Sequence, residues 1–172
     1  DKNGADVFAV AALRKLYTGM KAYVQLWPGC ESRGITVDRG VWQGDPLSPV
    51  LFNLVLRQVL TDVNSVWQKR GYGTEVGNDM RNVQLKHIAF ADDVALIGKN
   101  WLQVKRRVLE LRTAMLARGL ALHPSKCKAQ TNIDGWSKRG DVALNEEFNI
   151  EVLPEDACLH ILGTTLSLKD VT

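Results

Sequence analysis

Two adjacent aspartates, Asp92 and Asp93, are the residues of this sequence with the clearest potential for chemistry. Their neighbours Phe90, Ala91 and Val94 are apolar, so we expect the pair to be buried. Two buried like charges are costly unless a proton or a cation compensates them. Carboxylates are preferred ligands of Mg²⁺, and two such ions can promote nucleotidyl transfer. The pair therefore predicts a metal site, with Asp92 as the direct ligand and Asp93 more peripheral; a solvent-exposed acidic turn is the open alternative.

A glycine-rich turn followed by a helix start occupies residues 40–49, upstream of the aspartates. Gln43 and Gly44 lie in the turn, Ser48 is placed to cap the helix, and Pro49 suits its first position. A helix N-terminus presents free N–H groups and a positive potential, which suit a phosphate or a template backbone. Taken alone, the segment is better explained as a helix cap.

Residues 40–52 and 90–93 together resemble the reverse transcriptases of non-LTR (LINE-type) retrotransposons, and group II intron maturases have similar but distinguishable segments. Residues 119–126 resemble the segment that brings a lysine, here Lys126, to the incoming triphosphate. Leu162 and Gly163 resemble the turn that positions the primer 3′ end. These four segments follow one another in the order that the family requires.

The resemblance implies a division of roles among these residues. Asp92, with Asp93 beside it, would hold two catalytic Mg²⁺ ions, for which Mn²⁺ could substitute. Lys126 would neutralise charge on the leaving pyrophosphate and could donate a proton as a general acid. The substrate-binding positions implied by the resemblance are Gln43, Gly44, Ser48, Pro49, Phe90, Ala91, Leu162 and Gly163.

The sequence also departs from the family pattern. The unusual residues are Trp42 in the glycine-rich turn, His123 and Cys127 around Lys126, and Ile161 before Leu162. The family's first metal-binding aspartate, together with the residue that selects the sugar, would fall before residue 1. Asp6 is a poor substitute because it lies too close to the glycine-rich turn. We therefore expect a three-carboxylate site that is incomplete in this chain.

Composition is that of an ordinary globular domain, with 172 residues, 45% hydrophobic residues and a net charge of +3. Five basic residues crowd one predicted helix and could face nucleic acid or merely solvent: Lys105, Arg106, Arg107, Arg112 and Arg118. Three widely spaced cysteines form no disulfide framework, which favours a reducing compartment. No apolar run is long enough to predict a membrane-spanning helix. The N-terminus has no initiator Met, so we expect an internal piece of a longer protein.

Apolar periodicity predicts an α+β fold with helices packed on one face of a small antiparallel sheet. The predicted helices cover residues 7–16, 48–67, and 101 to a stop at Gly119, the last capped by Asn100 with Gln103 in the reciprocal position. The predicted strands cover residues 22–26, 34–41, 83–90, 94–97, 129–131, 150–153 and 159–168, with a loop or short hairpin at 71–81. By resemblance this is a polymerase palm (48–172) with partial fingers (1–47) and no thumb.

The function that we expect is RNA-directed DNA polymerisation by the full-length protein of a retrotransposon. Its partners would be an RNA template, a DNA primer and deoxynucleoside triphosphates, with no membrane, and its expected location is the nucleus. Without the first aspartate, residues 1–172 alone should be inactive. Two other classes stay open: a degenerate, non-catalytic palm that only binds nucleic acid, and an unrelated α+β domain with a fortuitous acidic turn.

Overall fold

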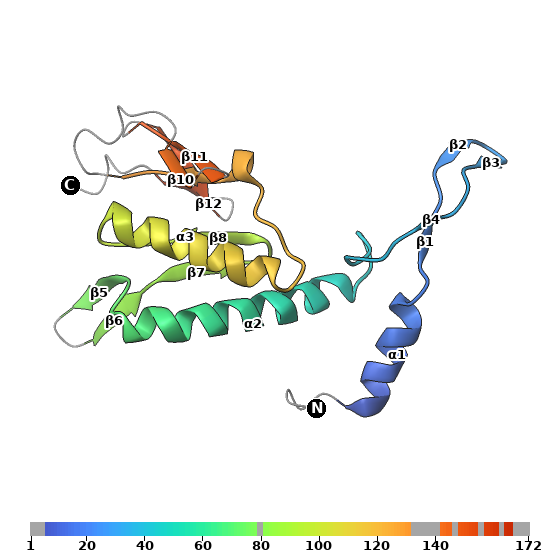
Figure 1. Ribbon diagram of the computed structural model, residues 1–172, viewed down its shortest axis with the longest axis horizontal. Coiled ribbons are helices and arrows are strands. Elements are labelled where there is room, and N and C mark those ends of the chain that lie inside the picture. The colour runs from blue at the N-terminus through green and yellow to red at the C-terminus, as the bar shows by residue number, and fades with distance from the viewer. Residues whose placement is uncertain are drawn as a thin grey trace. The chain divides into compact units, whose positions relative to one another are not determined.

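The computed structural model describes residues 6–78, 81–131, 142–145, 148–154, 157–161 and 164–166. The chain divides into two compact units, Asp1–Ser48 and Pro49–Thr172. Within the described residues there are three α-helices, one short 3₁₀-helix and a set of short strands, as Figure 1 shows. This content confirms the predicted α+β class.

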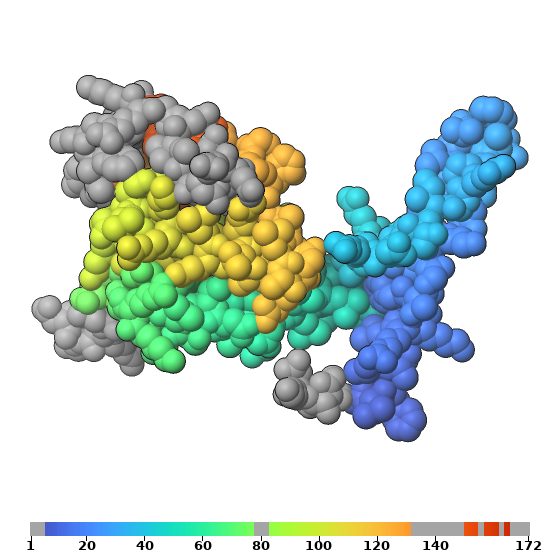
Figure 2. Space-filling model, viewed as in Figure 1, coloured from blue at the N-terminus to red at the C-terminus, as the bar shows by residue number. Residues whose placement is uncertain are grey.

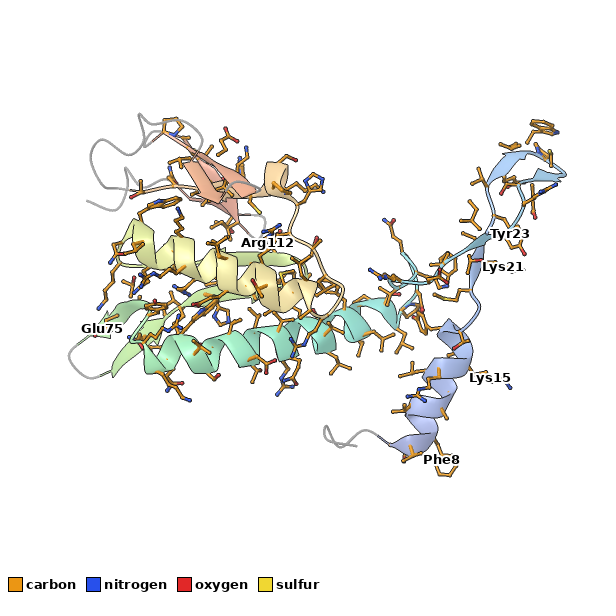
Figure 3. All side chains as sticks on the ribbon, in the orientation of Figure 1. Phe8, Lys15, Lys21, Tyr23, Glu75 and Arg112 are labelled. Atoms are coloured by element: carbon orange, nitrogen blue, oxygen red, sulfur yellow. The ribbon has the colours of Figure 1, made fainter. Side chains whose placement is uncertain are left out.

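Helix α1 (Val7–Tyr17) begins the first unit and confirms the helix predicted at 7–16. Asp6 caps it, because its Oδ1 accepts hydrogen bonds from the backbone N–H groups of Phe8 (2.8 Å) and Ala9 (3.1 Å). The carboxylate of Asp6 therefore has a structural partner in its own helix. The apolar side chains of α1 remain largely exposed, and that of Phe8 is 85% accessible (Figure 3).

Two small antiparallel ladders follow α1 in the first unit. Strand β1 (Lys21–Ala22) pairs with β4 (Ile35–Thr36), and β2 (Gln25–Trp27) pairs with β3 (Cys30–Glu31). Gly29, in the turn between β2 and β3, has a φ of +83°, which a residue with a side chain rarely adopts. The strands predicted at 22–26 and 34–41 thus exist in shorter form around the predicted turn.

Helices α2 (Ser48–Lys69) and α3 (Trp101–Leu116) form the centre of the second unit. They lie side by side in Figures 1 and 2 and share one hydrophobic core, onto which strand residues and the segment after α3 also pack. The buried members of this core are Val59, Val63, Trp67, Leu111 and Met115. Its residues recur at spacings of three and four, which is the pattern that predicted both helices.

The ends of α3 follow the predicted capping with one difference. Asn100 Oδ1 accepts the N–H of Gln103 at 2.9 Å, and Gly119 has a φ of +75° just beyond the helix, so both predicted ends are confirmed. The Gln103 side chain, however, accepts from the N–H groups of Lys99 (3.1 Å) and Gly73 (3.4 Å) rather than from Asn100. Gln103 thereby ties the start of α3 to the preceding hairpin.

Two hairpins connect α2 to α3. Strand β5 (Thr74–Asn78) pairs with β6 (Arg81–Leu85), and β7 (His87–Phe90) pairs with β8 (Asp93–Leu96). The single strand predicted at 83–90 is wrong, because it breaks at Lys86. Gly73, just before β5, lies against this break: a Cβ there would come within 2.8 Å of the Leu85 carbonyl oxygen.

The described residues of the C-terminal part form a short 3₁₀-helix, η1 (Pro124–Lys126), and five short strands. Strand β9 (Lys128–Ala129) pairs in parallel with β11 (Phe148–Val152), which pairs antiparallel with β10 (Val142–Asn145). Strands β12 (Leu159–Ile161) and β13 (Thr164–Leu166) form a separate ladder.

One small antiparallel sheet is therefore not what the described residues form. Their strands, two to five residues long, make six separate small sheets, and the one three-stranded sheet contains the parallel pair. Strands this short cannot build a broad sheet, so the helices contact individual hairpins instead. Among the residues that the structure describes, no helix is long and apolar enough to cross a bilayer.

Candidate active site

The tip of the β7–β8 hairpin carries the two aspartates. Phe90 pairs with Asp93, so Ala91 and Asp92 form a two-residue turn between the strands. Ala91 has a φ of +49°, and it is the only non-glycine with a positive φ among the described residues. Two-residue hairpin turns require this conformation at their first position, although it is unfavourable for any residue with a Cβ. The turn therefore holds the aspartates at a tight, strained corner.

Asp92 and Asp93 are exposed to solvent, which contradicts the expectation that they are buried. The side chain of Phe90 is 70% accessible as well. The physical reason is that β8 packs on the core of α2 and α3 through Val94 and Leu96, whereas the side chains of Phe90, Asp92 and Asp93 at the tip are not part of that core. Because water can solvate both carboxylates, burial gives no argument for a compensating cation here.

The ligand chemistry of the turn still fits Mg²⁺. This ion is commonly bound by one or two carboxylates, with phosphate oxygens and water completing its shell. Asp92 and Asp93 supply two such carboxylates from one turn. In the described part of the chain, no group of three or more His, Cys, Asp or Glu residues could hold a metal ion. The turn alone thus provides part of a metal-binding site.

The glycine-rich turn in the first unit is organised by Asp45, a residue that the sequence analysis did not single out. Its Oδ1 accepts the N–H of Leu47 at 3.0 Å, and its Oδ2 accepts the hydroxyl of Tyr17 at 2.7 Å. The Leu47 N–H and the Tyr17 hydroxyl both lower the pKa of Asp45, and the same hydroxyl contact raises the pKa of Tyr17. An aspartate bonded to the backbone two residues later is a typical turn former, which was the available signal.

Ser48 does not cap α2 as predicted. It is already the first residue of the helix, and its buried hydroxyl donates to the carbonyl oxygen of Trp42 at 2.6 Å. This bond closes the turn that contains Gln43 and Gly44, which are both exposed. Gly44 has a φ of +90°, so the turn depends on glycine at that position. The turn is held by Asp45 and Ser48 together.

An open cleft of about 670 Å³ lies between α2 and β7 in the second unit. Three residues that the sequence placed in the substrate site line it: Pro49 from α2, and Phe90 and Ala91 from the hairpin tip. Its floor also contains Asn64 and His87, whose Oδ1 and Nδ1 atoms are buried without a hydrogen-bond partner among the described residues. The cleft thus brings part of the predicted site together beside the aspartates.

Lys126 lies exposed at the end of η1, a single turn closed by hydrogen bonds from the N–H of Lys126 to His123 O and from the N–H of Cys127 to Pro124 O, both 3.0 Å. The Nδ1 atom of His123 lies 3.0 Å from the hydroxyl of Ser125. Burial raises the pKa of the Cys127 thiol. His123 and Cys127 therefore have ordinary structural surroundings.

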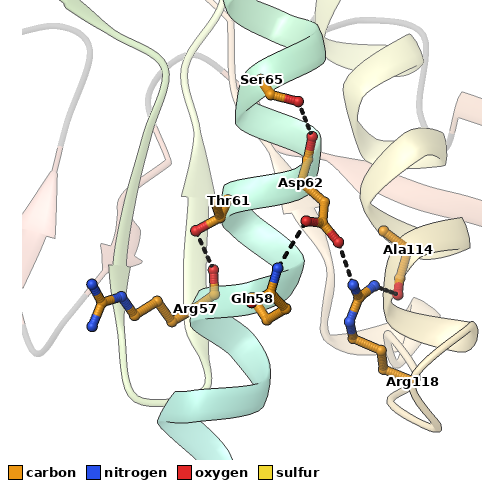
Figure 4. Close-up of polar contacts among 7 residues, drawn as sticks. All are labelled: Arg57, Gln58, Thr61, Asp62, Ser65, Ala114 and Arg118. Carbon is orange, nitrogen blue, oxygen red and sulfur yellow. Dashed lines mark hydrogen bonds and ion pairs between the residues drawn. The ribbon is translucent and has the colours of Figure 1, made fainter. Parts of the chain in front are cut away.

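The segment that leads to Lys126 is fastened to α2 at its start. Figure 4 shows Arg118, just after α3, in an ion pair with Asp62 of α2, which also accepts from Gln58 Nε2 at 2.9 Å. Arg118 donates as well to the carbonyl oxygen of Ala114 at 3.4 Å. The exit of α3 is thereby attached to the helix that lines the cleft.

The remaining predicted site residues fall elsewhere. Gln43 and Gly44 belong to the first unit, whereas Asp92, Asp93 and Lys126 belong to the second. Leu162 and Gly163, predicted to form the primer-binding turn, lie outside the described residues.

Arg107 is the functional candidate that sequence reasoning misplaced. It was counted among the basic residues of a helix face, but its side chain is completely buried, with 0% accessible surface. Its guanidinium carbon lies 4.3 Å from the centre of the Trp67 ring. The sequence spacing could have revealed this burial. Positions 104, 107, 111 and 115 are three or four residues apart, which places Arg107 in the apolar stripe of α3.

Comparison with known proteins decides the family. The family model described as reverse transcriptase (RNA-dependent DNA polymerase) matches residues 7–166. The chain belongs to the reverse transcriptase family. This match extends over both aspartates, the glycine-rich turn, the Lys126 segment and the positions of Leu162 and Gly163.

Individual relatives of this reverse transcriptase chain are retrotransposon proteins. It is 34% identical over 103 residues to a retrovirus-related Pol polyprotein from a type-1 retrotransposable element R2 of Popillia japonica, covering 60% of the chain and 14% of the relative. It is 35% identical over 99 residues to the Pol polyprotein from the type-2 element R2DM of Drosophila melanogaster, covering 58% and 8%. A Nasonia vitripennis R2 polyprotein is 29% identical over 121 residues, covering 70% and 11%. No solved structure matches significantly.

These findings confirm the predicted resemblance to retrotransposon reverse transcriptases. The chain spans less than a fifth of the length of each of these relatives. Members of the reverse transcriptase family normally use divalent metals, a nucleic-acid template and deoxynucleotides.

Proposed function

We propose that the full-length protein containing this chain is an RNA-directed DNA polymerase of a retrotransposon, which extends a DNA primer on an RNA template. The observation that carries the proposal is the solvent-exposed Asp92–Asp93 turn beside a cleft lined by Pro49, Phe90 and Ala91, within a family match that covers residues 7–166. Such an enzyme would work on chromosomal DNA, which places it in the nucleus.

The role proposed for the hairpin tip is metal binding. Asp92 and Asp93 would hold Mg²⁺ ions, or Mn²⁺ in their place, and bound ions of this kind neutralise charge on the attacking and leaving oxygens. Their exposure supports the proposal, because a metal-binding carboxylate must be reachable by a nucleotide and its phosphates. One further carboxylate from outside residues 1–172 would complete the set, so this chain alone should not extend primers.

The other predicted residues would bind and position the substrates. Lys126, exposed at the end of η1, would place its ammonium group against the triphosphate. Gln43 and Gly44 would line the pocket of the incoming nucleotide, while Ser48 supports that turn through its bond to Trp42. Leu162 and Gly163 would contact the primer. Phosphoryl transfer requires mainly positioning and charge stabilisation, which these residues can supply.

A second candidate is a non-catalytic relative that retains the fold and only binds nucleic acid. The substitutions at Trp42, His123, Cys127 and Ile161 favour it, because each departs from the family pattern near a substrate-binding position. Group II intron maturases are a further alternative within the reverse transcriptases. The R2 relatives favour the retrotransposon enzyme over the maturase.

The test is primer extension by the full-length protein on a primed RNA template with Mg²⁺ and deoxynucleotides. We expect extension by the wild-type protein and a loss of about 100-fold or more in Asp92→Asn, as is typical when a group that stabilises the transition state is removed. Glu75→Gln is the matched control, because it removes an exposed carboxylate of β5, labelled in Figure 3. Binding of the duplex without extension under Mg²⁺ or Mn²⁺ would establish the non-catalytic candidate instead.

A further inference from the structure

The open end of the β7–β8 hairpin, opposite the aspartates, is held by a buried arginine. Arg107 Nη1 donates to the carbonyl oxygen of Ile97 at 2.5 Å, and Nη2 donates to the carbonyl oxygen of Lys86. Lys86 directly precedes β7 and Ile97 directly follows β8, and the two are themselves joined by a 3.0 Å bond from Ile97 N to Lys86 O. One planar guanidinium therefore spans both strands at the point where they leave the ladder.

The same side chain connects the hairpin to both helices. Arg107 belongs to α3 and stacks on the indole ring of Trp67, a fully buried residue of α2. The Nε1 of Trp67 in turn donates to Glu110 Oε2 of α3 at 2.7 Å, and Glu110 forms an ion pair with Arg70, the residue directly after α2. His87 of β7 contacts the other side of this cluster, with its ring 6.0 Å from that of Trp67 in an edge arrangement.

Stability alone does not explain a cation at this position. Burial lowers the pKa of Arg107 to about 10, so the group stays charged at neutral pH. Its hydrogen bonds go to two backbone carbonyls, it stacks on an indole face, and the nearby charge of Glu110 offsets part of the lowering of its pKa; its Nε has no hydrogen-bond partner among the described residues. A well-packed apolar side chain of similar volume often stabilises a core as much as a buried charge does. An apolar residue could not supply two N–H donors that bind a carbonyl group of each strand at the same time.

These two hydrogen bonds from Arg107 affect the orientation of the aspartates. Side chains alternate between the faces of a strand, so a slip of one residue in the hairpin would turn each of them to the opposite face. The strands are only four residues long, and few cross-strand bonds fix their register. A contact that fixes both Lys86 and Ile97 therefore determines which way Asp92 and Asp93 face at the tip.

We propose that Arg107 is a positioning residue for the Asp92–Asp93 turn, acting through the carbonyl groups of Lys86 and Ile97. The proposal rests on the metal-binding function proposed for this turn. It assigns to Arg107 no contact with substrate or metal.

The first experiment measures activity in the full-length protein with Arg107→Met, which keeps an unbranched side chain on α3 but removes the guanidinium and its hydrogen-bond donors. We expect kcat for primer extension to fall at least about tenfold, as misplacement of a reacting group does. The Mg²⁺ concentration for half-maximal activity should rise several-fold, whereas the affinity for the template–primer duplex should not change. Lys69→Met is the matched control, because Lys69 is an exposed cation at the end of α2 and its loss should leave these values unaltered.

Two further variants separate positioning from general loss of structure. Met115→Ala removes a buried side chain from the same helix but leaves the hydrogen bonds from Arg107 to the hairpin in place. It should lower the melting temperature without raising the Mg²⁺ requirement of the folded protein. Arg107→Lys keeps the positive charge but cannot donate to both carbonyl groups in the same geometry. If Arg107→Met folds poorly, Arg107→Lys should therefore fold normally but recover only part of kcat. Normal kcat and Mg²⁺ dependence in folded Arg107→Met, or full restoration by lysine, would overturn the proposal.

Hydrogen exchange supplies a readout that does not depend on activity. In Arg107→Met, amides of residues 86–97 should exchange at least about tenfold faster relative to those of α2, whereas Met115→Ala should accelerate both segments alike. Equal acceleration of both segments in Arg107→Met would refute the positioning role. The wild-type protein could fail to extend any primer while residues 86–97 still exchange faster in Arg107→Met. In that case the proposed function is wrong, but the structural role of Arg107 in holding the hairpin is supported.

Discussion

The two ends of the β7–β8 hairpin differ in almost every physical respect. At the tip, Phe90, Asp92 and Asp93 are exposed, and the turn contains a strained alanine. At the open end, Arg107 and Trp67 are completely buried and joined to both helices. The comparison teaches that the proposed chemistry and the structural support are separated by one short pair of strands. The exposed end can be optimised for ligands because the buried end supplies the rigidity.

The largest expected effect is at the buried end, in Trp67→Ala. Removing a fully buried aromatic side chain costs about 3–5 kcal/mol of unfolding free energy, and here it would also leave the stacked Arg107 without its partner. The matched control is Trp27→Ala in the first unit, where the side chain is 63% accessible. Exposed substitutions usually change stability by less than about 0.5 kcal/mol.

Urea denaturation of the two variants, followed by circular dichroism, checks this difference. Similar urea midpoints for Trp67→Ala and Trp27→Ala would contradict the view that the open end of the hairpin is more rigidly packed than the exposed surface. A much lower midpoint in Trp67→Ala alone would support that view.

A smaller effect should appear as a pH dependence at His87, the first residue of β7 at the open end of the hairpin. Burial, followed by the charges of Arg107 and Lys86, lowers its pKa below the ordinary value of 6.5. The unfolded chain therefore takes up a proton at a higher pH than the folded chain does. The contribution of His87 to the free energy of unfolding should be fully present above about pH 6.5. It should decrease as the pH falls from there towards the folded-state pKa.

Melting temperatures measured between pH 7.5 and pH 5 provide the check on His87. His87→Gln should flatten part of the decrease below pH 6.5, whereas His123→Gln, at an exposed position, should retain it. An unchanged pH profile in His87→Gln would show that this imidazole is as well solvated in the folded chain as in the unfolded one.

The smallest expected effect is at the tip itself, in Ala91→Gly. A left-handed conformation costs about 1–2 kcal/mol for a residue with a Cβ, but glycine loses about 0.4–1 kcal/mol more conformational entropy on folding. We therefore expect a net stabilisation between about 0 and 1.6 kcal/mol, measured by urea denaturation. Ala91→Val is the opposite control, since a branched side chain tolerates φ near +49° poorly and should destabilise the hairpin. Destabilisation by glycine would show that the turn is unstrained.

Local sequence signals predicted the helices and the hairpin turn well. Asn100 and Gly119 marked the ends of α3 correctly, because capping depends on residues that are close in sequence. The Phe90–Asp93 turn was found for the same reason. At the ends of α3 and in the hairpin turn, residues close in sequence decide the local conformation, so contacts with distant segments did not change the predicted structure.

The errors concern contacts between distant segments. The strand predicted at 83–90 breaks at Lys86, whose carbonyl oxygen is used by Arg107, 21 residues away. The aspartates were expected to be buried because their neighbours are apolar, yet Phe90 has no core to enter at the tip of a two-stranded hairpin. Arg107 itself was read from its charge rather than from its place in the apolar stripe. Residue type alone does not reveal which partner a side chain meets.

Gly73 has a consequence for how such a sequence tolerates mutational drift. A side chain there would press on the Leu85 carbonyl oxygen, immediately beside the Lys86 carbonyl that Arg107 grips, and its φ of +117° already excludes most residues. If the proposed function holds, a sequence could keep both aspartates intact and still lose primer extension through a change at this one glycine. In a comparison of related sequences, the residue at position 73 would then indicate loss of activity better than the acidic turn does.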